Sequence, residues 1–146
     1  MKYMNRNGNH VEDDPLSARV IGLAIKVHAD LGTGFLESIY HRALEIELAE
    51  AGLDFISETS LTVFYRRKVV GNFTADLIIE GRLLLELTAL ENLPFSAEVQ
   101  TVNYLKAAGL DVGLILNFGT APLQIKRKYR NLPLIDPNLR LHESGS

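Results

Sequence analysis

Two carboxylates, Asp76 and Glu86, occur in a segment of the sequence that is otherwise rich in apolar residues. The segment Gly71–Ala89, GNFTADLIIEGRLLLELTA, is typical of two strands joined by a tight turn. The turn is predicted at Glu80-Gly81-Arg82, where the glycine can adopt a positive φ. We therefore ask first where the two acids lie in this predicted hairpin.

A register that pairs Ile79 with Leu83 places Asp76 directly opposite Glu86. Side chains alternate between the two faces of a strand, so Thr74 and Thr88 share the face of the two acids. The opposite face is then entirely apolar and consists of Ala75, Leu77, Ile79, Leu83, Leu85 and Leu87.

Two opposed carboxylates in such a hairpin need a compensating group. Like charges directly opposite each other destabilise a strand pair, and burying them unpaired costs several kcal/mol more. A bound cation, a shared proton or a basic partner would compensate, and Mg²⁺ suits one or two carboxylates. The alternative is that a bulge separates Asp76 from Glu86, or that one acid lies in water at the sheet margin. The residues alone favour neither interpretation.

Three helices are predicted around this hairpin. The first begins at Asp14-Pro15, a capping residue followed by a proline suited to the first helical position. Helical spacing of apolar residues continues to Leu31. The second helix is expected from about Phe35 to Ala51, and the third from Pro94 to Ala108.

The remaining segments alternate in the manner of strands, and the chain ends are polar. Residues 14–130 are expected to form a single domain, with a flexible segment at 1–13 and a tail at 131–146. The element order predicts an α/β fold, a mixed sheet with helices packed on it. The expected strands, besides the hairpin strands 69–79 and 83–89, are Leu53–Ile56, Leu61–Tyr65, Val112–Phe118 and Leu123–Tyr129.

Other polar residues on the predicted helices could support chemistry. Glu37 falls in the first turn of the second helix, where the helix dipole favours a carboxylate. Gln100 and Tyr104 are four residues apart on the third helix and share one of its faces. The amide of Gln100 needs a hydrogen-bond partner, either a strand carbonyl or a ligand phosphate or metal-bound water. Glu98 is expected to be a solvated charge.

Composition excludes several classes of protein. The 146 residues include no cysteine, which excludes disulfides and thiolate metal sites. No apolar run approaches the ~20 residues that span a bilayer, and no signal peptide is visible, so we expect a cytoplasmic protein without a membrane partner. A net charge of −3 argues against bulk coating of nucleic acid. Local basic groups remain at Arg66-Arg67-Lys68, predicted to be a turn, and at Lys126, Lys128 and Arg130. The second group is predicted to be a solvated sheet edge, with phosphate binding as the alternative.

Several motifs in order carry a family resemblance. VHADLGTGFLESIY, ending at Tyr40, resembles the signature of the GxxExxY protein family. Its further motifs have counterparts in Ala75-Asp76-Leu77, Glu86-Leu87-Thr88, the helix with Gln100 and Asn103–Ala107, and Asn117-Phe118-Gly119. The resemblance extends from about Val20 to Arg130.

The GxxExxY family is similar to the PD-(D/E)XK nuclease superfamily, whose restriction-endonuclease-like core is a central mixed sheet flanked by helices. The resemblance implies Mg²⁺- or Mn²⁺-dependent phosphodiester hydrolysis of nucleic acid. It also implies that Asp76 is the principal metal ligand, that Glu86 is the second, and that Glu37 helps to hold the metal site. Gln100 and Tyr104 match the Q-x-x-x-Y element of RecB-like nucleases.

Thr88 departs from the motif, which places a lysine at this position. Threonine cannot supply a positive charge, although it can donate a hydrogen bond to a water. Lys106 and Lys68 are candidates for a relocated lysine. Three hypotheses follow: an active nuclease, a metal-binding homologue with weak activity, or a non-catalytic module that binds nucleic acid or protein. A homodimer is also left open.

Overall fold

The computed structural model describes residues 14–130, so the predicted flexible segment 1–13 and tail 131–146 lie outside the described residues. Within this range three helices accompany a five-stranded sheet. Their bounds are α1 Pro15–Leu31, α2 Glu37–Glu50, β1 Phe55–Tyr65, β2 Lys68–Ile79, β3 Leu83–Thr88, α3 Phe95–Ala108, β4 Val112–Asn117 and β5 Gln124–Tyr129.

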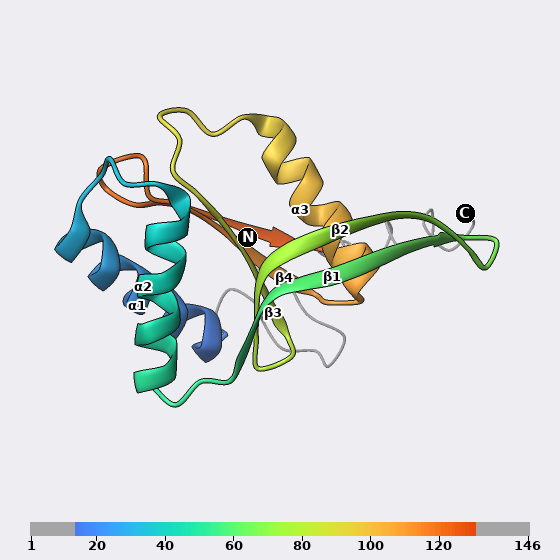
Figure 1. Ribbon diagram of the computed structural model, residues 1–146, viewed down its shortest axis with the longest axis horizontal. Coiled ribbons are helices and arrows are strands. Elements are labelled where there is room, and N and C mark those ends of the chain that lie inside the picture. Colours follow the sequence, from blue (N-terminus) through green and yellow to red (C-terminus); the bar gives the residue numbers. More distant parts are fainter. Residues whose placement is uncertain (1–13, 131–146) are drawn as a thin grey trace, which may run out of the picture.

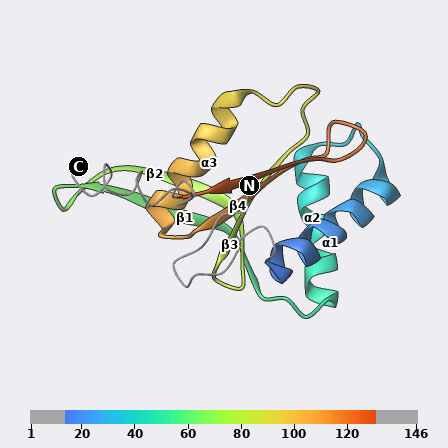
Figure 2. The same cartoon turned by 180° about the vertical axis from the view of Figure 1, so that it is seen from behind.

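The sheet is mixed and its strands follow the order of the chain, β1-β2-β3-β4-β5. Only β3 and β4, which are joined through α3, run parallel among these strands; the other neighbours are antiparallel. Helices α1 and α2 lie side by side at one end of the molecule, and α3 lies apart from them (Figure 1; Figure 2 from behind). The predicted α/β fold, a central mixed sheet flanked by helices, is confirmed.

Alternation along the strands produces two cores. The larger core joins α1 and α2 to one face of the sheet, with Tyr40, Leu44 and Leu85 among its fully buried members. The smaller core, Ala75, Leu84 and Leu105, joins α3 to the other face. No helix among the described residues is long and apolar enough to cross a membrane.

The first helix begins as predicted. The Asp14 carboxylate accepts a hydrogen bond from Leu16 N at 3.0 Å, and Pro15 is the first helical residue. The second helix begins at Glu37, two residues later than predicted. The reason is a hydrogen bond from Phe35 N to the buried Tyr40 hydroxyl, which holds the preceding residues in a loop.

The β2–β3 hairpin has the predicted register close to its turn. Leu77 pairs with Leu85, Ile78 with Leu84 and Ile79 with Leu83. Glu80 and Gly81 both have positive φ, and Arg82 N donates to Ile79 O at 3.0 Å, as in the turns that match strand twist.

The pairing of β2 with β3 ends at Leu77 and Leu85. Beyond this point β2 pairs with β1 alone, while β3 continues beside β4. We call this point of separation the fork, and Asp76 and Glu86 are the first residues beyond it. The β1–β2 hairpin leaves the body of the molecule here and projects as a long two-stranded arm (Figure 1).

Two sequence predictions near the fork are wrong. The separate strands 53–56 and 61–65 are a single strand, β1, because the polar residues between them also pair with β2. Ala75 was predicted on the face of Leu77, but it packs with Leu84 and Leu105 on the α3 side. The ladder has a gap between the pairs Ser57–Leu77 and Thr59–Ala75, where Glu58 has a φ of 53°. This irregularity lies beside the point where Ala75 and Leu77 pack into different cores.

The end of β4 is clamped to the loop that follows β3. The Asn117 side chain accepts a hydrogen bond from Leu90 N and donates one to Leu90 O, both at 2.9 Å. Gly119 passes so close to this loop that a Cβ atom there would overlap the backbone of Leu90. The N-F-G motif therefore fixes the entry to α3.

Substituting Gly119→Ala should lower the free energy of unfolding by about 1–3 kcal/mol, because the added methyl group must displace the Leu90 backbone. Urea denaturation measures the change. The matched control is Gly71→Ala, where a Cβ meets no atom within 4 Å and φ is not in the left-handed region. Equal unfolding midpoints for the two variants would contradict the clamp.

Candidate functional site

The three acids singled out from the sequence lie near one another at the fork. Glu86 is partly buried, and its pKa is raised from 4.5 to about 9. Burial is the main cause, followed by the charge of Asp76, a hydrogen bond with the Asp76 side chain and the charge of Glu37. The structure therefore places Asp76 beside Glu86 and Glu37 near them, although the three acids do not form a ready cluster for a metal ion within residues 14–130.

Asp76 is fixed in the fork by the backbone of the strand that has moved away. Its Oδ2 atom accepts a hydrogen bond from Leu87 N at 2.7 Å. The Asp76–Glu86 pair is absent from the strand pairing within residues 14–130, although counting placed the two residues opposite each other. The Asp76 carboxylate thus provides the Leu87 N–H group with a hydrogen-bond acceptor just beyond the end of the β2–β3 ladder.

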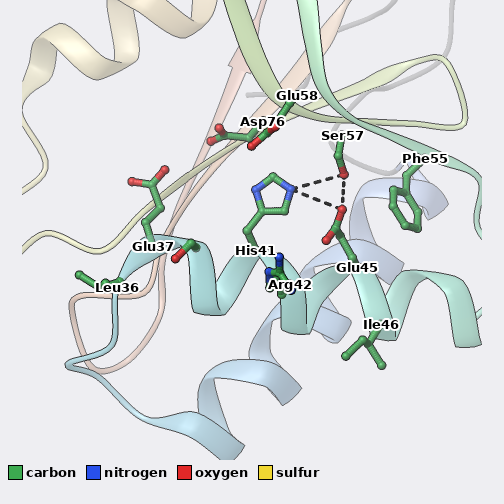
Figure 3. A pocket seen from close by; sticks show the side chains of 11 residues that line it. Leu36, Glu37, His41, Arg42, Glu45, Ile46, Phe55, Ser57, Glu58 and Asp76 are labelled. Atoms are coloured by element: carbon green, nitrogen blue, oxygen red, sulfur yellow. Dashed lines mark hydrogen bonds and ion pairs between the residues drawn. The ribbon is translucent and has the colours of Figure 1, made fainter.

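Glu37 reaches the site from the first residue of α2. Burial raises its pKa, the charge of Asp76 raises it further, and His41 lowers it. Figure 3 shows the carboxylates of Glu37 and Asp76 directed into the space between α2 and the strands. This space is a cavity of about 1040 Å³ that both side chains line.

Tyr40 explains why α2 begins where it does. Its hydroxyl donates to Gly32 O at 2.6 Å and accepts from Phe35 N at 3.2 Å, and its ring stacks on Phe118 with centroids 4.6 Å apart. The side chain is fully buried. In the G-x-x-E-x-x-Y motif, the tyrosine therefore anchors the loop that positions Glu37.

Gln100 and Tyr104 approach the acids from the opposite face of the sheet. Gln100 Nε2 donates to the Tyr104 hydroxyl at 2.6 Å, and the Tyr104 ring stacks on Phe73 with centroids 3.7 Å apart. Burial raises the pKa of Tyr104, and the charges of Glu86 and Asp76 raise it further, whereas the hydrogen bond with Gln100 lowers it. The tyrosine hydroxyl is therefore directed to the side of the site opposite Glu37.

The donor atoms suit a hard divalent cation. Glu86 Oε1 and Thr88 Oγ1 are buried and have no hydrogen-bond partner in the described part of the chain. Within residues 14–130 no three His, Cys, Asp or Glu side chains form a ready cluster for a metal ion. Mg²⁺ is commonly held by one or two carboxylates, with water and phosphate oxygens as its other ligands. Asp76 and Glu86 fit such a site.

His41 lines the same cavity as Glu37 and Asp76. Its Nε2 atom lies 3.4 Å from Ser57 Oγ and 3.7 Å from a Glu45 carboxylate oxygen, and Ser57 donates to Glu45. The other ring nitrogen faces Glu37 and Asp76 (Figure 3). The sequence contained a signal, because His41 is four residues from both Glu37 and Glu45, and all three share one helix face.

The lysines predicted as replacements for the motif lysine lie elsewhere. Lys68 is the first residue of β2, eight residues from Asp76, which in an extended strand is about 26 Å. Lys106 is exposed in the last turn of α3, two residues beyond Tyr104 and so on another side of that helix. Neither lysine is brought to the acids.

Other basic residues of the sheet are engaged in ion pairs. Lys128 Nζ lies 3.1 Å from Glu98 Oε1, with both side chains less than one-quarter exposed. The predictions of a solvated Glu98 and of a solvated basic edge are therefore wrong at this pair. Arg130 is likewise paired with Asp111, at 2.6 Å. These bases attach β5 to its neighbours.

Comparison with known proteins supports the fold. The family model described as the PD-(D/E)XK nuclease superfamily matches residues 14–129. The crystal structure of SSO0001 superposes with a TM-score of 0.51 at 21% identity, over 74% of this chain and 56% of that chain, so this chain spans little more than half the length of SSO0001. No curated protein matches the sequence. Since the family match includes all the strands and helices around the acid pair, the chain belongs to the PD-(D/E)XK nuclease superfamily.

Proposed function

We propose that this protein is a Mg²⁺- or Mn²⁺-dependent phosphodiesterase that cleaves nucleic acid at the fork. The observation that carries the proposal is the convergence of Asp76 and Glu86 at a point where one Glu86 oxygen is buried and has no hydrogen-bond partner within residues 14–130. A cation bound there would activate water and stabilise negative charge on phosphate oxygens. PD-(D/E)XK nucleases generally use these two cations, which supports the proposal.

The chain's own residues have distinct roles under this proposal. Asp76, held by Leu87 N, and Glu86 bind the cation, and Glu37 adds negative charge that strengthens its attraction. Gln100 and Tyr104 form a hydrogen-bonded pair that orients a phosphate oxygen or a water from the α3 side. The motif residues Gly34, Glu37 and Tyr40 support the finer assignment to the GxxExxY family.

His41 is the basic group best placed to serve where Thr88 has replaced the motif lysine. Glu45 and Ser57 hold one ring nitrogen and leave the other toward the acids. An imidazole held in this way can stabilise negative charge or transfer a proton. Its side chain is only 14% exposed, so its orientation is restricted.

A non-catalytic module that binds nucleic acid or protein is the second candidate. The observation that favours it is Thr88, whose hydroxyl is buried without a partner in the described part of the chain and carries no positive charge. Under this hypothesis the acids would be a remnant of the ancestral site. We expect either form in the cytoplasm, and the oligomeric state, including a homodimer, is left to experiment.

Asp76→Asn and Glu86→Gln should each reduce Mg²⁺-dependent cleavage of DNA or RNA by about 100-fold or more, because each removes a charged ligand. Gel-based cleavage assays measure the loss. Wild type should also gain melting temperature on addition of Mg²⁺ or Mn²⁺, and the two variants should not. Glu98→Gln is the control, since that acid pairs with Lys128 away from the fork. Full activity in Asp76→Asn would refute the metal site.

The metal-free protein should lose stability as pH rises. Folded Glu86 has a pKa of about 9 and the ordinary value is 4.5, so between these values the folded state holds a proton that the unfolded state has released. Stability is thus fully present below the ordinary pKa and is lost as pH rises toward the folded pKa. Thermal melting in chelator should show a falling melting temperature, with a smaller slope in Glu86→Gln. Parallel slopes would show that Glu86 does not carry the effect.

Thr88→Lys should raise cleavage activity, because it restores a cation on the face of Asp76 and Glu86. His41→Gln should lower the activity of wild type more than that of Thr88→Lys, since the new lysine takes over part of its role. Initial rates of the four proteins measure this coupling, and Thr88→Val is the control without either hydroxyl or charge. If wild type and Thr88→Lys are both inert on DNA and RNA, the non-catalytic hypothesis replaces the enzymatic one.

A further inference from the structure

The β1–β2 arm beyond the fork has a charge opposite to that of the remaining chain. Between Glu58 and Asp76 there is no acidic residue, and the three bases Arg66, Arg67 and Lys68 occupy the tip. The whole chain has a net charge of −3, so the rest of the protein carries −6. We call residues 59–75 the basic ribbon. Its charge makes it complementary to an anionic partner.

The turn at the tip uses arginine where the backbone favours other residues. Arg66 and Arg67 have φ values of 50° and 67°, both in the left-handed region. Turns of this kind are dominated by Asn, Asp and Gly. The other hairpin turn of the sheet follows that preference, with Gly81 at its second position. The two arginines therefore keep a strained backbone, which points to a use for their side chains.

Apolar side chains accompany these bases at the tip. Phe64, Tyr65, Val69 and Val70 are all more than half exposed, and the Arg66 guanidinium lies 5.4 Å from the centre of the Tyr65 ring. Val70 is an extra residue in β2, because Val63 pairs with Gly71 while Phe64 pairs with Val69. Such a bulge increases the twist of a two-stranded ribbon.

We propose that the basic ribbon binds double-stranded DNA by entering its major groove, with Arg66, Arg67 and Lys68 contacting phosphates. This inference rests on the proposed function and names its substrate. The major groove of B-DNA is about 12 Å wide and admits a two-stranded ribbon, whereas that of double-stranded RNA is deep and narrow. Positive charge and exposed apolar side chains together suit phosphates flanking base edges.

The length of the ribbon fixes where it meets the DNA. Lys68 is eight residues from Asp76, or about 26 Å along an extended strand. At about 3.4 Å per base pair this corresponds to at most seven or eight base pairs, a span reached when the arm lies along the helix axis. The ribbon thus contacts the duplex within that distance of the bond that the acids would cleave.

The test replaces the tip by its favoured turn, in the variant Arg66→Asn/Arg67→Gly. This change removes two charges but relieves the backbone, so its melting temperature should equal or exceed that of wild type. Its Kd for a fluorescein-labelled DNA duplex, measured by anisotropy in chelator, should rise at least about 10-fold. The dependence of log Kd on log salt should fall by about two. Lys106→Ala/Arg127→Ala, which removes two exposed charges outside the ribbon, is the control.

Equal affinity and equal salt dependence for the ribbon variant and the control would overturn the proposal. Equal binding of double-stranded RNA would overturn the major-groove assignment. Self-association of wild type that the variant abolishes, without duplex binding, would assign the ribbon to a second copy of the chain instead. Because binding is measured in chelator, it is separate from cleavage: a protein that binds duplex through the ribbon but never cleaves it would refute only the proposed activity.

Discussion

The structure depends on the placement of two acids at the point where β2 separates from β3. Burial and the neighbouring charge of Asp76 raise the pKa of Glu86 to about 9, which shows how unfavourable two negative charges are at this point. The Asp76 carboxylate accepts a hydrogen bond from Leu87 N, just beyond the last pair of the β2–β3 ladder. Holding Asp76 and Glu86 together at the fork therefore costs electrostatic free energy. A positively charged group that binds there reduces this cost and so stabilises the fold.

The fork also explains how one site draws on both faces of the sheet. Helix α2 with Glu37 and His41 packs on one face, and α3 with Tyr104 packs on the other. A continuous sheet would separate these side chains, yet both Glu37 and Tyr104 respond to the charge of Asp76. The opening between β2 and β3 therefore allows residues from opposite layers to act on the same pair of acids. Tyr40 and the Asn117 clamp then fix the segments that lead into the two helices.

The sequence predicted those features of this arrangement that depend on residues close together in the chain. The β2–β3 register was correct because a tight turn determines which residues pair next to it. Ala75 was misplaced because it packs with Leu105 of α3, a contact that counting along the hairpin cannot reveal. The pairing of Glu98 with Lys128 and the distance of Lys68 from the acids likewise depend on contacts between segments far apart in the chain. The metal roles of the acids came from family resemblance and remain predictions.

The distribution of charge connects the fork to the ribbon. The acids repel a polyanion at the fork, whereas the tip, with its strained arginines, attracts one about 26 Å away. Under the proposed function, DNA would therefore be held first by the ribbon and kept away from the metal-free acids. A divalent cation would offset the negative charge of the acids at the fork and offer a phosphate oxygen a positive centre to approach. Placing the bases on a separate arm, and not beside the acids, avoids neutralising the carboxylates that must bind the cation. The absence of a lysine at Thr88 is consistent with this separation, because no fixed positive charge then competes with the cation for the carboxylates.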